Sequence, residues 1–419
     1  MSKLAVNGGE PYIKPGFIKD WPPIDRIDEE YVMDSLHSPQ HAFGKHFEAF
    51  EKEFTAWVGA KYGRPTNSGT SALHMCIAGV GCNCGDEVIV AAYSWPSSAT
   101  CILHSNCIPV FVDIDFATIN LDIQKIEAAI TPKTKAIIAI HLHGVPMEMD
   151  PIMEIAKKHN LYVIEDCCQA HGATYKGKKV GNFGHCAAFS QNQNKVLCAG
   201  EGGFFVSNDE EIFNRASLLW NFGETKAPYE KRDNHAYALG WMYTPNDMTC
   251  AFGRAQLTKL DGYLKQIKEN AMALENELKD VPGLILPYVP KDCQSNYYNY
   301  TIRLDCDKLG FGDRKREFRD KFLEALAAEG TQINVWQNFI LPRMTVFLAQ
   351  NAYGYGCPWE CPHSEAKPYY PDAYPMAQLH TDTHFGMTVP LRSPNGPDVA
   401  QAVGKAIKKV YENIDELNM

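Results

Sequence analysis

The stretch LYVIEDCCQAHG at residues 161–172 decides the fold class of this chain. Its first four residues form an apolar run that ends in two carboxylates, Glu165 and Asp166. Such a run is typical of a strand buried on both faces of a parallel sheet. Because ligands of these sheets bind beyond the carboxyl ends of the strands, Asp166 is expected to face a ligand. An aspartate that only caps the next turn is the alternative.

Similar apolar runs lie on both sides of this stretch, and helical patterns separate several of them. We predict strands at 87–91, 109–115, 135–141, 161–166, 186–190 and 203–207, and helices at 123–130 and 151–159. Before them come an amphipathic helix with Phe47, Phe50, Phe54, Trp57 and Val58, the loop GAKYGRPTNSGT (59–70), and an apolar helix from Ser71 to about Ala78. This alternation indicates an α/β fold with a mostly parallel, mixed sheet flanked by helices.

The pattern changes after Asp209, where a second region is expected to begin. Residues 221–243 are predicted to be a long loop, and 247–278 a long helix that links a large domain to a smaller one. A strand at 299–304, a charged helix at 313–329, an irregular stretch at 338–380 and a last amphipathic helix with Val399, Val403 and Val410 follow. We therefore predict a large domain over 1–260 and a smaller C-terminal α+β domain over 261–419.

Composition restricts the classes of function. The chain has 419 residues, 45% of them hydrophobic, and a net charge of -10. No basic run suggests binding to nucleic acid or to an anionic membrane, and no apolar segment reaches the length of a membrane span. The N-terminal residues show no secretory signal, so we expect a cytoplasmic protein whose 14 cysteines are free thiols. Cys82–Cys84 and Cys357–Cys361 lack zinc-ribbon spacing, and no metal site is predicted.

Three further features accompany Asp166 at predicted strand ends or helix starts. NSGT (67–70) precedes an apolar helix, whose free N–H groups suit a phosphate, although a plain N-cap is the alternative. Trp95 follows a strand and can stack on a planar heterocycle or simply pack in the core. Lys195, between a strand and a Gly-rich turn, has uncharged neighbours that favour imine formation, whereas most lysines in connections are solvated.

These four features follow one another in the order phosphate loop, aromatic ring, acid and lysine. That is the order of a fold-type I enzyme dependent on pyridoxal 5'-phosphate (PLP). In PLP chemistry an aspartate keeps the pyridine nitrogen protonated, so that the ring accepts electrons, and a lysine holds the cofactor as an imine. We therefore expect a fold-type I PLP-dependent transferase.

At these residues the chain resembles the DegT/DnrJ/StrS family of PLP-dependent sugar and aminocyclitol aminotransferases. The likeness covers roughly residues 1–270 and is loose in the C-terminal third. The matching stretches are NSGTSAL (67–73), GDEVI (85–89), ITPKTKAI (130–137), IEDCCQAHG (164–172) and GEGG (200–203). The resemblance implies a fold-type I homodimer with active sites at the subunit interface.

The resemblance also implies a role for each matching residue. Lys195 and Asp166 are the implied catalytic residues, the first as imine former and proton carrier, the second as partner of the pyridine nitrogen. The implied cofactor-binding residues are Gly69, Thr70 and Ser190 at the phosphate, Trp95 stacked on the ring and Gln169 at the 3'-oxygen, together with Asp166 and Lys195.

Two stretches depart from the family pattern. In GWMYTPN (240–246), Met242 and Thr244 stand where relatives carry an Asn that reaches the neighbouring subunit's phosphate and an Arg. The QNQN stretch at 191–194 is closer to the cyclitol and aminohydroxybenzoate members than to the nucleotide-sugar members. Tyr229, His235, Tyr243 and Arg392 are plausible substrate contacts, and we assign none of them to the site.

We therefore expect an aminotransferase that moves an amino group from glutamine or glutamate to a keto group on a cyclitol or sugar, by a ping-pong mechanism. One alternative is other PLP chemistry, such as dehydration, cyclisation or substitution at an amino acid. Dehydratases of the family carry His at the Lys195 position. A second alternative is a non-catalytic binding or regulatory protein, for which the altered Met242 and Thr244 are the only support.

Overall fold

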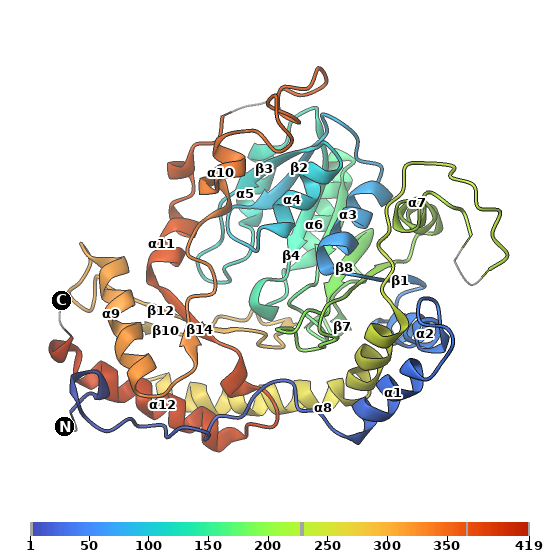
Figure 1. The fold of residues 1–419 in the computed structure, drawn as a ribbon. Helices are drawn as coiled ribbons and strands as arrows, with labels where there is room; N and C mark the ends of the chain where they lie inside the picture. The colour runs from blue at the N-terminus through green and yellow to red at the C-terminus, as the bar shows by residue number, and fades with distance from the viewer. Residues whose placement is uncertain (1–2, 227–229, 366–367, 418–419) are drawn as a thin grey trace.

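A seven-stranded sheet lies at the centre of the computed structural model, which describes residues 3–226, 230–365 and 368–417 (Figure 1). The five strands at one side of the sheet are parallel, whereas β9 is antiparallel to both of its neighbours. The predicted mostly parallel, mixed sheet is therefore confirmed. In spatial order the strands are β1 (Tyr62–Thr66), β9 (Gly203–Ser207), β8 (Cys186–Ser190), β5 (Tyr162–Asp166), β4 (Thr134–Ile140), β2 (Glu87–Ala91) and β3 (Ile108–Val112).

Helices flank this sheet because its strands are apolar and almost wholly buried. α3 (Gly69–Gly79) packs against β8 and β9, and also against α4 (Ser97–His104) and α7 (Glu210–Trp220). α5 (Ile123–Ala129) and α6 (Met149–His159) pack together beside β3, β4 and β5. α2 (Lys45–Val58) contacts β1. The predicted helices at 47–58, 71–78, 123–130 and 151–159 are thus confirmed.

Three sequence predictions are wrong in part. Residues 62–66 of the predicted loop form β1, an edge strand, where a proline such as Pro65 is tolerated because one side of the strand has no ladder to lose. α4 and α7 were not predicted; Asp209 caps α7 by accepting hydrogen bonds from the backbone N–H groups of Glu211 and Ile212. The stretch at 338–380 includes two helices, α10 (Thr345–Leu348) and α11 (Pro375–Thr383).

The long helix α8 (Asp247–Leu278) connects two hydrophobic cores (Figure 1). Asn246 caps its start by accepting a hydrogen bond from the Thr249 N–H. α1 (Arg26–Leu36) and α2 pack on its first half, and α12 (Pro397–Glu412) lies along it on the side of the second core. The predicted helix at 247–278 is confirmed.

The second core is built around a four-stranded antiparallel sheet and α9 (Lys315–Ala328). The strands are β10 (Leu284–Ile285), β12 (Tyr300–Leu304), β14 (His384–Met387) and β13 (Ile333–Asn334). A small sheet of β11 (Cys293–Gln294), β6 (Thr174–Tyr175) and β7 (Lys178–Lys179) joins the two parts of the chain. Leu4, Ile13 and Ile18 pack in the second core, and Ile340 and Phe347 in the first, so the boundary at 260 stays a prediction.

No helix in the described parts of the chain is both long and apolar enough to cross a membrane. All 14 cysteine side chains are present as thiols rather than disulfides. The Sγ atoms of Cys357 and Cys361 lie 3.1 Å apart.

Glu165 anchors the edge of the sheet from which the next residue, Asp166, projects. Its fully buried carboxylate accepts backbone hydrogen bonds from Gly181, Phe183 and Gly184, each at 2.7 Å. His141 Nε2 lies 3.1 Å from the same carboxylate and donates to it, because His141 Nδ1 already accepts the Met147 N–H. A Cys167 thiol lies within 4.8 Å of both groups, but the carboxylate oxygens are already engaged by these donors.

We predict that Glu165→Gln lowers the free energy of unfolding at pH 7 by about 2–4 kcal/mol, because an amide cannot accept all four hydrogen bonds. Burial raises the pKa of Glu165, but the hydrogen bond from His141 and those from the backbone outweigh it and hold the pKa below its ordinary 4.5. The carboxylate therefore stabilises the fold above pH 4.5 and loses this effect as the pH falls through its lowered pKa.

Urea unfolding at several pH values measures this difference in stability. The gap between wild type and Glu165→Gln should be largest near neutrality and narrow below pH 4.5. Equal stability at pH 7, or a gap that does not change with pH, would contradict the assigned role.

Candidate active site

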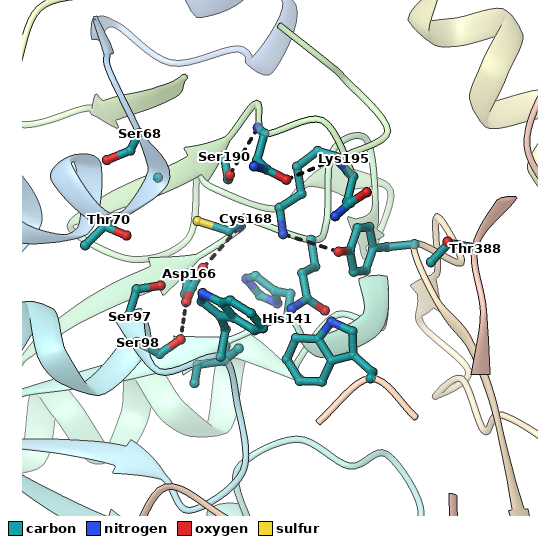
Figure 2. Close-up of a pocket in the computed structure, with 18 of the residues that line it drawn as sticks. Ser68, Thr70, Ser97, Ser98, His141, Asp166, Cys168, Ser190, Lys195 and Thr388 are labelled. Carbon is teal, nitrogen blue, oxygen red and sulfur yellow. Dashed lines mark hydrogen bonds between the residues drawn. The ribbon is translucent and has the colours of Figure 1, made fainter. Parts of the chain in front are cut away.

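A cavity of about 480 Å³ lies at the carboxyl edge of the parallel strands, between the two cores (Figure 2). Residues at the ends of β4, β5 and β8, at the start of α3 and after β2 line one side, and residues from the C-terminal part of the chain, between 298 and 388, line the other. Every site residue predicted from the sequence lines this one cavity: Gly69, Thr70, Trp95, Asp166, Gln169, Ser190 and Lys195.

Lys195 projects into the cavity from the turn between β8 and β9. Its backbone N–H donates to Asn192 O at 2.8 Å, and the turn is closed by Gln193 N–H to Gly200 O at 2.7 Å. The side-chain Nζ lies 3.4 Å from the Tyr298 hydroxyl and 4.6 Å from the centre of its ring. No carboxylate of a described residue forms an ion pair with Nζ, so the amine faces the cavity beside a hydroxyl and an aromatic ring.

Asp166, the last residue of β5, is held in one orientation by two donors (Figure 2). The Ser98 hydroxyl donates to Oδ2 at 2.7 Å, and the Cys168 backbone N–H donates to Oδ1 at 3.1 Å. Ser98 itself is paired with the Ser94 hydroxyl at 2.8 Å. With 5% of its surface exposed, Asp166 offers its remaining acceptor capacity to a cationic group in the cavity.

Gln169 presents a hydrogen-bond donor to the same space. Its Oε1 accepts the backbone N–H of His143 at 2.8 Å, which orients the side-chain amide. The Nε2 group is therefore directed away from that contact, and no described residue accepts a hydrogen bond from it. A donor fixed in this way suits an acceptor oxygen on a ligand.

The start of α3 and Ser190 form a tight polar corner. Ser68 caps the helix by accepting the Ser71 N–H at 3.1 Å, and Gly69 and Thr70 occupy the first turn, where backbone N–H groups lack intrahelical acceptors. A Cβ on Gly69 would lie 2.7 Å from Ser190 Cβ and 3.0 Å from Cys168 Sγ. The corner thus combines free N–H groups, hydroxyls and close packing, the features of an anion site.

Two tryptophans stand at the opening of the cavity. Trp95 is 52% exposed, and its ring centre lies 6.0 Å from that of Trp336, at an interplanar angle of 49°. Trp336 also packs edge-on against His143 at 4.8 Å. Their flat, accessible surfaces can cover a planar ring or the apolar face of a saturated one.

Several lining residues escaped the sequence analysis. Ser98 lies three residues after Trp95, at the start of an unpredicted helix, and the adjacent Ser97 was the only signal. Five further lining residues belong to the C-terminal third, where no motif marks them: Tyr298, Asn334, Val335, Trp336 and Thr388.

The four possible substrate contacts have different surroundings. Tyr229 lies outside the described residues. His235 packs on Tyr237 at 4.5 Å, and the Tyr243 hydroxyl lies 2.9 Å from His74 Nδ1. Arg392 is buried and does not line the cavity.

The departures from the family pattern lie on the arm formed by residues 221–226 and 230–243 and its junction with α8. Met242 is 47% exposed, while Thr244 is buried and its hydroxyl lies 3.2 Å from the Met242 sulfur. Asn246 caps α8 through its Oδ1, which accepts the Thr249 N–H at 2.8 Å. Large apolar side chains are exposed along the arm, namely Phe222, Tyr237, Leu239, Trp241 and Met242.

The arrangement has a definite chemical character. An amine nucleophile, an oriented carboxylate and an oriented amide donor surround one cavity, with an anion site at one end and aromatic rings at the other. A flat heterocycle with a carbonyl group, a basic ring nitrogen, an acceptor oxygen and a phosphate matches every one of these groups, and PLP has this structure.

Comparison with known proteins supports the same interpretation. The sequence pattern of the DegT/DnrJ/EryC1/StrS aminotransferase family matches residues 22–368. GDP-perosamine synthase of Caulobacter vibrioides is 35% identical over 316 residues, 74% of this chain and 81% of that protein. A putative L-glutamine:3-amino-2,3-dideoxy-scyllo-inosose aminotransferase of Streptoalloteichus tenebrarius is 34% identical over 337 residues, 79% of each chain.

A solved structure agrees over nearly the whole chain. DesV of S. venezuelae, determined in complex with a ketimine intermediate, superimposes with a TM-score of 0.77 at 27% identity, covering 93% of this chain and 95% of that one. The resemblance found in the sequence and the expected fold are thereby confirmed. The chain belongs to the DegT/DnrJ/EryC1/StrS family of PLP-dependent aminotransferases.

Proposed function

We propose that this enzyme transfers an amino group from glutamine or glutamate to a keto group on a cyclitol or sugar, with Lys195 and Asp166 as its catalytic residues. The observation that carries the proposal is the convergence of the Lys195 amine, the Asp166 carboxylate and the Gln169 amide on one cavity. When bound, PLP supplies an electron sink that stabilises negative charge at the carbon atom being deprotonated.

The residues fit the cofactor group by group. The first turn of α3 with Gly69, Thr70 and Ser190 would hold the phosphate, because free N–H groups and hydroxyls point into that corner. Asp166, oriented by Ser98, would bind the protonated ring nitrogen, and Gln169 Nε2 would donate to the 3'-oxygen. Trp95 would cover the ring face at the open side of the cavity.

Lys195 has two tasks in this scheme. Its Nζ would hold the cofactor covalently at the aldehyde carbon, with loss of water, until an amino donor takes its place. The freed amine would then accept the proton from the donor Cα and give it up again, so that one side chain would act as base and acid. The Tyr298 hydroxyl, 3.4 Å from Nζ, keeps the amine within reach during both steps.

The substrate classes follow from the relatives and from the cavity wall. The names of the two relatives give a glutamine donor in one case and a perosamine product in the other. The cavity is large enough for the cofactor and a ring beside it, and Asn334, Thr388 and Trp336 offer polar groups and an apolar surface to a polyol. These side chains suit a ring that carries several hydroxyl groups.

The exposed arm supports a homodimer with a shared active site. Leu239 is 81% exposed and Trp241 48%, and apolar side chains gathered on one segment are typical of an interface. A two-fold dimer would place this arm against a second copy of the chain. The unpaired thiols suit a reducing compartment, so we place the enzyme in the cytoplasm.

The first prediction concerns the donor half of the reaction. Protein supplied with PLP should show a visible absorbance band that glutamine or glutamate converts to the near-ultraviolet band of pyridoxamine phosphate, with release of one keto acid per site. Lys195→Ala should abolish this conversion, because no other described amine faces the cavity. Lys268→Ala, an exposed lysine on α8, serves as control and should behave as wild type.

The outcome separates the possible reactions. A band that depends on Lys195 but that no amino donor shifts would favour PLP chemistry other than transamination. Conversion that persists in Lys195→Ala would overturn the role of this lysine.

The second prediction concerns the phosphate corner. Gly69→Ala should weaken PLP binding by at least about tenfold, because the added methyl group meets Ser190 and Cys168 and displaces the first turn of α3. Gly262→Ala is the matched control, since nothing lies within 4 Å of a Cβ at that position. Fluorescence titration with PLP measures both; equal affinities for the two variants would contradict the assignment of the corner.

The third prediction concerns the dimer. Sedimentation should show a dimer for the wild type. Trp241→Asp should raise the dissociation constant of the dimer by at least about tenfold, because a charge would be buried in the interface. Met272→Asp places the same charge at another exposed apolar residue, on α8, and should leave the dimer intact. A monomeric wild type, or equal effects of the two substitutions, would count against the arm as the interface.

A further inference from the structure

Arg392 is a buried cation that the proposed mechanism does not use. Its side chain is 1% exposed, and none of the ion pairs between described residues includes it. Burial lowers its pKa to about 10, and its Nε has no hydrogen-bond partner among the described residues. A buried guanidinium without a carboxylate is unfavourable, so its presence suggests a task beyond stability.

The contacts of Arg392 lead directly to Lys195. Its Nη2 donates to the carbonyl oxygen of Asn194, the residue before Lys195, at 2.9 Å. The same nitrogen donates to the carbonyl oxygen of Tyr298 at 3.3 Å, and Tyr298 is the residue whose hydroxyl lies beside Lys195 Nζ. One guanidinium therefore holds the backbone of both members of the Lys195–Tyr298 pair.

The loop that carries Arg392 is itself anchored to two other parts of the chain. Asn270 on α8 donates to the carbonyl oxygens of Leu391 and Asn395, at 2.9 Å and 2.8 Å. Asn395 exchanges two hydrogen bonds with the backbone of Lys19 near the N-terminus. These hydrogen bonds fix the loop that carries the guanidinium.

The N-terminal segment completes the support from the other side. The Trp21 ring lies 5.1 Å from the Arg392 guanidinium carbon, close enough for a cation–π contact. The carbonyl oxygen of Trp21 accepts a hydrogen bond from Gln193 Nε2 at 3.3 Å, two residues before Lys195. Segments from both ends of the chain therefore meet at the turn that carries the lysine.

We propose that Arg392 is a positioning residue that fixes Lys195 against Tyr298 by binding the two backbone carbonyls next to them. The inference rests on the proposed role of Lys195, and it adds a determinant from the second core to a site whose other groups come mostly from the first. Arg392 itself does not touch the cavity, so it acts through the lysine turn rather than on the substrate. Small displacements of a reacting amine have large effects on the reaction rate, so a residue that holds the Lys195 turn in place affects catalysis.

The test compares Arg392→Met and Arg392→Lys with Arg319→Met. Arg319 is also 1% exposed and donates to the Thr381 carbonyl oxygen, but it lies on α9 in the second core. Competitive acetylation of the PLP-free protein, read by mass spectrometry, reports how freely Lys195 reacts. The pH dependence of the absorbance band with PLP reports the surroundings of the bound lysine.

Arg392→Met should raise the acetylation rate of Lys195 by at least about tenfold and shift the pH midpoint of the band, because the turn loses both carbonyl contacts. Arg392→Lys, which keeps a cationic donor, should lie between this variant and wild type. Arg319→Met should lower the melting temperature and leave both Lys195 measurements unchanged.

The proposal would be overturned if Arg392→Met showed the Lys195 acetylation rate and the pH midpoint of the wild type. It would also be overturned if Arg319→Met changed both quantities as much as Arg392→Met does. If Arg392→Met does not fold, Arg392→Lys decides the question in the same way. The two proposals fail separately, because a protein that shows no Lys195-dependent band refutes the proposed function, whereas acetylation of PLP-free protein still measures the hold of Arg392 on Lys195.

Discussion

The parallel pairing of β5 with β4 and β8 is the constraint on which the site depends. Ile140 pairs with Asp166, and Asp166 with Ala188, so these strands end side by side at one edge of the sheet. His141, Asp166 and the Lys195 turn must then converge there, because strands that run in one direction end on the same side. The Glu165 carboxylate secures this edge by joining His141 after β4 to the loop before β8.

The C-terminal part of the chain forms the wall of the cavity that faces the sheet. Tyr298 precedes β12 and Trp336 follows β13, and both close the cavity opposite the strand ends. Arg392 reaches back from the loop before α12 to the turn that carries Lys195. Because α8 contributes to both cores, and Asn270 on it holds the Arg392 loop, the relative placement of lysine and acid depends on packing between the two parts as well as on the sheet.

Prediction from the sequence succeeded where periodic signals were long. The helix at 247–278 is long, and the buried strands show continuous apolar runs, whereas Gly63 and Pro65 obscure β1, and two-residue strands such as β13 are too short for either signal. The candidate cofactor residues could be named because they lie in motifs at strand ends. Tyr298, Trp336 and Arg392 could not, because they reach the site through tertiary contacts of a region without motifs. Arg392 in particular looks like any lone charge until its burial is known.

The most direct test of the account is the identity of the residue that binds PLP covalently. The protein with PLP is reduced with borohydride, digested, and its peptides are mapped by mass spectrometry. We predict a pyridoxyl group on Lys195, at one per chain, and loss of this label when an amino donor is added before the reduction. Labelling spread over exposed lysines, or a specific label on any other residue, would contradict the central claim that the cavity between the two cores is the active site.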